Sequence, residues 1–98
     1  MQFPTQEYPF NEQTVKRVAE VGGVYGLSQP TQSGRFRILY VGNSDNLQRR
    51  LLEHLNNPPI RGITHFFMEA VPTALSRFAR EAALIREFAP PGNTVGKP

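Results

Sequence analysis

Glu81 is the residue whose position in this sequence most strongly suggests chemistry. It lies three residues after Phe78 and four before Ile85, so helical spacing places its carboxylate in the middle of an apolar stripe. An ionised carboxylate inside a core costs several kcal/mol without a partner, which is most of the stability of a small domain. The charge therefore needs a compensating arginine, an escape to solvent at the domain edge, or a bound cation.

A divalent cation is the functional solution for such a carboxylate. Carboxylate oxygens are hard ligands, and one carboxylate with waters and a substrate phosphate is enough to hold Mg²⁺. We therefore expect one Mg²⁺ or Mn²⁺ ion on Glu81.

Two other segments supply side chains that suit such a site. Arg50 and His54 are four residues apart in a leucine-rich helical pattern, so both reach one point at the boundary between core and solvent. Tyr25 and Tyr40 lie in two β-rich runs, and a loop centred near Gln32 places them opposite each other on one face of a sheet. The simpler alternatives are an aromatic cross-strand pair for the tyrosines and a solvated surface position for His54.

The composition favours an anionic partner and excludes several classes of site. The 98 residues include nine arginines but only two lysines, with a formal net charge of +3, and the planar guanidinium suits phosphate well. The absence of cysteine excludes disulfides, thiolate zinc sites and cysteine nucleophiles, and is typical of a reducing compartment. No apolar run is long enough for a membrane span, so we expect a cytoplasmic protein with no membrane partner.

The pattern of elements predicts an α+β fold, a small three-stranded antiparallel sheet flanked by helices. Residues 1–10 are expected to form an irregular arm, and Pro90-Pro91-Gly92 to start an irregular tail. Between them we expect helices at 12–21, 44–56 and 73–88, capped by Asn11, Ser44 and Thr73, and strands at 24–28, 36–41 and 63–71.

Several spaced motifs of this chain resemble the GIY-YIG nuclease domain. Gly23-Val24-Tyr25 and Tyr40-Val41-Gly42 are similar to the two signature tripeptides, and Arg50 lies eight residues past Gly42, as the family's arginine does. The run from Glu81 to Arg86, with Pro90 and Asn93 beyond it, is similar to the ending of the repair-type domains. The match covers about residues 22–93 of a single domain at 1–98, with an arm and an extra helix at 1–21 and a tail at 94–98.

The resemblance implies a metal-dependent DNA endonuclease of GIY-YIG-like fold. By residue, it implies that Glu81 holds the metal, that Arg50 contacts the scissile phosphate, and that Tyr25 activates water with help from Tyr40 or His54. Further positions are Arg49 on the DNA backbone and the supporting residues Gly42 and Asn93. Gly92 stands where an aromatic is common in the repair-type domains, which predicts a more loosely packed tail.

Three points stay open at this level. A free phenol has a pKa of about 10, so Tyr25 can act as a base near neutrality only if its phenolate is stabilised, whereas His54 needs no such shift. The partner is DNA, with branched or damaged DNA among the candidates, and a dimer is one arrangement that the sequence permits. The alternative function is a catalytically inert nucleic-acid-binding or protein-interaction module on the same fold.

Overall fold

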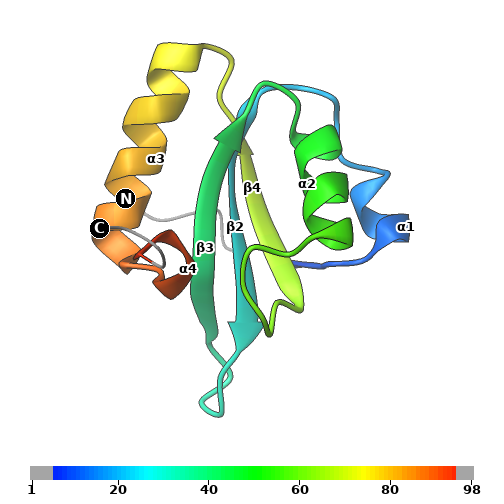
Figure 1. Cartoon of the computed structure of the whole chain (residues 1–98), viewed down its shortest axis with the longest axis vertical. Helices are drawn as coiled ribbons and strands as arrows, with labels where there is room; N and C mark the ends of the chain where they lie inside the picture. The colour runs from blue at the N-terminus through cyan, green and yellow to red at the C-terminus, as the bar shows by residue number, and fades with distance from the viewer. Residues whose placement is uncertain (1–5, 95–98) are drawn as a thin grey trace.

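The computed structural model describes residues 6–94, which form a four-stranded sheet between two layers of helices (Figure 1). The elements in chain order are β1 Tyr8–Pro9, α1 Glu12–Val15, β2 Gly23–Pro30, β3 Phe36–Ser44, α2 Leu47–Asn56, β4 His65–Ala70, α3 Ala74–Phe88 and α4 Pro91–Thr94. No helix in this part of the chain is long and apolar enough to cross a membrane.

The sheet is antiparallel throughout, in the order β1-β4-β2-β3. The predicted α+β fold is confirmed, with β2 and β3 as a hairpin and β4 on the other side of β2. The expected irregular arm is partly wrong, because Tyr8 and Pro9 pair with β4 as a fourth, two-residue strand. Strand β3 is an edge strand of the sheet, and the candidate site lies beside it.

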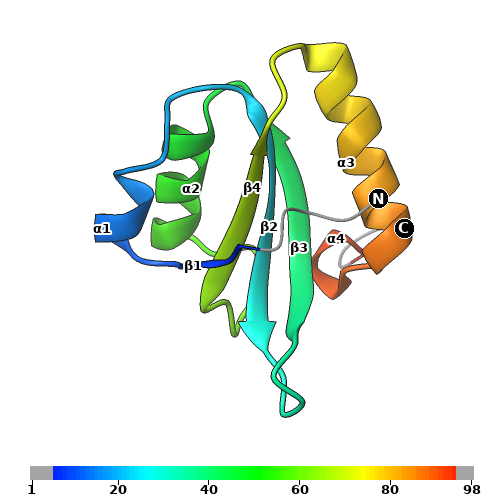
Figure 2. The ribbon, with the colours of Figure 1, turned by 180° about the vertical axis from the view of Figure 1, so that it is seen from behind.

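Helices cover both faces of the sheet, as Figures 1 and 2 show, with α1 and α2 on one side and α3 and α4 on the other. The first core, under α2, contains Tyr25 and Leu51, and the second, under α3, contains Val41 and Leu84. We call these sides the α2 face and the α3 face.

The register of the hairpin differs from the prediction. Tyr25 pairs with Gly42, and Tyr40 pairs with Leu27, so the expected Tyr25–Tyr40 pairing is wrong. The loop is centred on Ser33, and the register shifts by one residue after Leu27, where Leu39 is the extra residue of a β-bulge. Without that bulge Tyr40 would point to the α3 face. The bulge therefore places both tyrosines on the α2 face.

The helix boundaries correct three further predictions. Helix α1 ends at Val15 rather than Val21, although Asn11 caps it as expected. The N-cap of α2 is Asn46, whose side-chain oxygen accepts the Arg49 amide at 3.0 Å, while Ser44 ends β3. Residues 91–94 form the short helix α4 in place of an irregular tail.

Helix α3 begins at the predicted cap, Thr73, and ends at Phe88 as expected. Its inner face is partly different from the prediction. Phe78, which the spacing placed in the apolar stripe, is 61% exposed and is not part of the buried face. The face is instead formed by Leu84 and its partly buried neighbours. Glu81 is half-buried next to it, on the sheet side of the helix as predicted.

Candidate active site

The Tyr25 phenol lies between the sheet and α2 and reaches across β2 to the edge strand. The side chain is 1% exposed. Its oxygen and ring lie over Gly42, and a Cβ added at Gly42 would stand 2.6 Å from the Tyr25 Cζ. Gly42 therefore provides the space through which the hydroxyl approaches β3. This is the structural reason for a glycine in the second signature.

The Tyr25 hydroxyl is hydrogen-bonded to His54 Nε2 at 2.7 Å, in a buried position. His54 is only 4% exposed, so the solvated-surface alternative is wrong. Burial, and secondarily the Arg50 charge, lower the pKa of His54 to about 4. The imidazole is consequently neutral near pH 7 and able to accept a proton.

Two further effects act on the pKa values of this pair. The Asn57 backbone raises the pKa of His54 and so partly opposes the effect of burial. Burial first, and the neighbouring Tyr40 second, raise the pKa of Tyr25 well above its usual range, although Arg50 opposes this. The phenol therefore stays protonated in the free protein.

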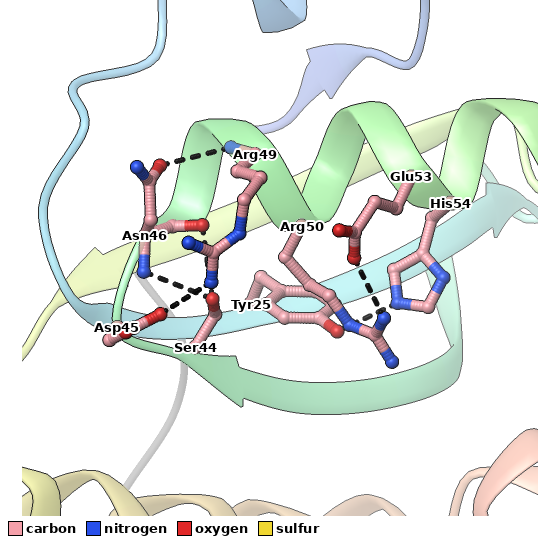
Figure 3. A network of polar contacts seen from close by, with 8 residues as sticks. All are labelled: Tyr25, Ser44, Asp45, Asn46, Arg49, Arg50, Glu53 and His54. Carbon is pink, nitrogen blue, oxygen red and sulfur yellow. Dashed lines mark hydrogen bonds and ion pairs between the residues drawn. The ribbon is translucent and has the colours of Figure 1, made fainter.

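Arg50 stands beside Tyr25, on the same helix as His54. Figure 3 shows its guanidinium beside the Tyr25 phenol and bonded to Glu53, with an N–O distance of 2.9 Å. The ion pair with Glu53 is the main reason why the pKa of Arg50 is raised. Its side chain is 43% exposed, so the guanidinium can exchange this carboxylate for another anion.

Tyr40 completes the aromatic side of the site. Its ring centroid lies 6.3 Å from that of Tyr25 and 5.5 Å from that of His54. The predicted proximity of the two tyrosines is therefore present, although the cross-strand register that was to produce it is not.

Glu81 approaches the same edge strand from the α3 face. Its carboxylate accepts a hydrogen bond of 2.8 Å from the Asn43 side-chain amide. No ion pair joins Glu81 to any residue within 6–94, because Arg80 pairs with Glu69 instead. The alternative of a salt bridge from Glu81 to an arginine is therefore wrong, and no basic side chain among the described residues pairs with its carboxylate.

The two halves of the site meet at consecutive residues of β3. Gly42 faces α2 and lies under the Tyr25 phenol, whereas Asn43 faces α3 and holds Glu81. The negative charge of Glu81 contributes to raising the pKa of Tyr25, so the two groups interact across the strand. Asn43 was missed by sequence reasoning, and its only signal was its place directly after Tyr40-Val41-Gly42.

The residues around Glu81 fit a cation that keeps most of its waters. Within residues 6–94 no cluster of three histidine, aspartate or glutamate side chains occurs, so a complete protein cage is not formed there. One carboxylate oxygen of Glu81 is oriented by Asn43, and the other has no partner among the described residues. Mg²⁺ is commonly bound in this way, by one or two carboxylates with waters and substrate phosphate.

The supporting residues also have defined positions. Asn93 bonds both the amide and the carbonyl of Val41 at 2.8 Å, and so fixes α4 against β3. The predicted loose packing at Gly92 is wrong, because a Cβ there would stand 2.6 Å from the Leu39 carbonyl oxygen. Arg49 lies on the exposed side of α2 and pairs with Asp45, as Figure 3 shows.

No protein-family model matches the chain, and no curated protein matches it. Solved structures do. One is the GIY-YIG N-terminal endonuclease domain of UvrC from Thermotoga maritima bound to its catalytic magnesium ion, at 23% identity and a TM-score of 0.67, covering 83% of this chain and 92% of that one. The fold is that of a GIY-YIG domain. An asparagine-to-alanine mutant of the Thermotoga maritima domain, bound to its catalytic divalent cation, matches at 22% identity with the same TM-score, over 82% and 90% of the two chains.

Proposed function

We propose that this protein is a metal-dependent endonuclease that hydrolyses a phosphodiester bond of DNA. The observation that carries the proposal is the buried Tyr25–His54 hydrogen bond, with Arg50 beside it and the unpaired Glu81 across the edge strand. The shared GIY-YIG fold supports it, since the neighbouring structures are endonuclease domains bound to a divalent cation.

The tyrosine and the histidine form the base of the reaction as a pair. In the tautomer of His54 with Nε2 unprotonated, the Tyr25 hydroxyl donates to Nε2 across the 2.7 Å bond, and the lone pairs of its oxygen are available to a water molecule. As Tyr25 removes the proton of that water, its own proton passes to the neutral Nε2 of His54. No free phenolate is then required, and the cost of the step lies instead in protonating His54, whose pKa burial lowers to about 4. Tyr40, next to both rings, keeps them in place.

Arg50 binds the scissile phosphate. Its guanidinium offers two parallel N–H donors to the phosphoryl oxygens, where negative charge grows during attack. To do so it must leave Glu53, an exchange that the half-exposed position of the pair permits. Its place beside the phenol oxygen brings the phosphate close to the water held by Tyr25.

Glu81 holds the divalent ion, with Asn43 orienting one carboxylate oxygen. An Mg²⁺ or Mn²⁺ ion at this position supplies Lewis-acid stabilisation of the phosphate oxygens and of the leaving alkoxide. Gly42 leaves space for the phenol, Asn93 fixes the strand on which both halves meet, and Arg49 contacts the DNA backbone outside the site. The similarity to repair-type domains favours branched or damaged DNA as the target.

A nicking assay with the full chain tests this proposal. Supercoiled plasmid and labelled branched or abasic duplexes are incubated with Mg²⁺, Mn²⁺ or EDTA. We expect cutting only with metal, and a loss of about a hundredfold or more in Glu81→Gln. This substitution keeps an oxygen that can accept from Asn43, so the fold is retained. Glu20→Gln, an exposed loop position with the same change of charge, serves as the control and should cut normally.

The outcomes separate the proposal from its alternative. Salt-sensitive DNA binding without cleavage in any metal would identify an inert binding module on the same fold. Equal cutting by the Glu81 variant and the control would remove Glu81 from the mechanism.

A further inference from the structure

The positive charge of the chain is concentrated at one end of the sheet. Segments 21–44 and 54–68 contain no aspartate or glutamate, but they carry Arg35, Arg37 and Arg61, which equal the whole formal excess of three charges. These segments contain the β2–β3 hairpin and the connection from α2 to β4, and the turn of the hairpin and this connection lie at the lower end of the molecule in Figure 1.

These three arginines differ from most other basic residues in having no partner. Lys16, Arg49, Arg50 and Arg80 each pair with a carboxylate. Arg35, Arg37 and Arg61 are exposed, and their guanidinium groups make no ion pair or hydrogen bond with any residue between 6 and 94. Three free guanidiniums in a segment without acidic residues form a surface suited to an extended anion.

The hairpin geometry places Arg37 on the α2 face, the same face as Tyr25, His54 and Arg50. Phe36 and Ile38 pack into the α3-side core, so Arg37 between them points to the α2 side, as Tyr40 does after the bulge. The Cα partner of Arg37 is Gln29, whose Oε1 lies 2.8 Å from a Cβ built on Gly62. The loop that carries Arg61 is thus packed against the cross-strand neighbour of Arg37.

The spacing fits a nucleic-acid backbone. Arg37 and Tyr40 pair with Gln29 and Leu27, which are two residues apart on β2, and a strand rises about 3.3 Å per residue, so the two lie about 7 Å apart along the edge strand. Phosphates of one DNA strand recur every 3.4 Å or so along the helix axis, so this distance corresponds to roughly two nucleotides. Arg35 lies further out, in the hairpin loop. DNA suits this surface better than an acidic peptide does, because the same DNA strand can offer phosphates both to these arginines and to the phosphate-binding arginine of the site.

We propose that Arg35, Arg37 and Arg61 form a phosphate-binding strip that holds the DNA backbone on one side of the scissile phosphate. The inference rests on the proposed function, because it takes the active site as the point from which the DNA runs. It adds that the protein binds the DNA asymmetrically, with more contacts to the DNA on the hairpin side of the scissile phosphate than to the DNA on the other side.

Fluorescence anisotropy with a labelled duplex, in EDTA and over a series of salt concentrations, tests the strip without any cleavage. Arg35→Gln/Arg37→Gln is compared with Arg17→Gln/Arg86→Gln, which removes the same charge from exposed arginines on α3 and next to α1 that also lack a described partner. We expect the strip variant to bind DNA about tenfold more weakly. The slope of the logarithm of its binding constant against the logarithm of the salt concentration should fall in magnitude by about two, because two phosphate contacts are lost. The control should change by about twofold at most. Arg61→Gln alone should lower the slope by about one.

Equal weakening of the two double variants would overturn the strip, since net charge alone would then explain the effect. Unchanged binding of the strip variant would overturn it as well, even if the wild-type protein cuts DNA. If the wild-type protein binds but does not cut, a selective loss in the strip variant supports the strip while the proposed function fails. Thermal melts of all variants establish that these exposed substitutions leave the fold intact.

Discussion

Gly42→Ala is the smallest change that should disable the site without altering any charge. The Cβ of an alanine would point to the α2 face, directly into the phenol of Tyr25. Its distance to Cζ would be 2.6 Å, and its contact with the hydroxyl oxygen would be shorter still. The phenol would have to move, or the edge strand would have to retreat.

The size of the displacement follows from these contacts. Ordinary carbon contacts begin at about 3.4 Å, so the phenol carbon must recede by about 0.8 Å from the 2.6 Å position. Tyr25 is 1% exposed and bonded to His54 at 2.7 Å, so a shift of this size stretches or breaks that hydrogen bond. Misplacement of a reacting group by about 1 Å can cost a hundredfold in rate, and overpacking costs about 1–3 kcal/mol in stability.

A double-mutant cycle measures this effect. Nicking rates and free energies of unfolding are determined for the wild type, Gly42→Ala, Tyr25→Phe and the double variant. We expect Gly42→Ala alone to cut about a hundredfold more slowly, but to have little further effect once the Tyr25 hydroxyl is gone. Wild-type cutting by Gly42→Ala, or additive losses in the double variant, would refute the reasoning that Gly42 acts by making room for the phenol.

Two further predictions concern stability. Because the pKa of His54 is about 4 in the folded chain and 6.5 in its ordinary state, the unfolded chain binds more protons between these values, so stability should be complete above pH 6.5 and fall as the pH drops towards 4. The loss should reach about 3 kcal/mol in urea unfolding, and His54→Gln should flatten this dependence; an unchanged slope would contradict a buried neutral imidazole. Asn93→Ala removes both bonds to the Val41 backbone and should cost about 1–3 kcal/mol, with faster hydrogen exchange at the Val41 amide. Unaltered exchange there would show that α4 does not depend on this side chain.

The sequence predicted the elements that local chemistry determines. The turn residues around Ser33 indicated the hairpin, and Thr73 marked the start of α3. Arg50 and His54 were placed together by helical spacing alone. These features depend on residues close in the chain, where spacing and caps carry most of the information.

The missed features depend on contacts between distant residues. A bulge at Leu39 has no sequence signature, so the register of Tyr25 and Tyr40 was predicted one way and formed another. Phe78 suggested a buried face by its type, although it is 61% exposed in the folded chain. The Asn43–Glu81 hydrogen bond joins residues 38 positions apart, and no local sequence pattern predicts such a pair.

The central claim is that Glu81 and the Tyr25–His54 pair belong to one metal-dependent site at the edge strand. Its most direct test is a crystal of the full chain soaked in Mn²⁺ and measured at the manganese absorption edge. We expect one anomalous peak at coordination distance from the Glu81 carboxylate, about 2.2 Å, on the side facing Tyr25 and Arg50. Saturating Mn²⁺ with no peak at Glu81, or a peak facing away from the phenol, would contradict it.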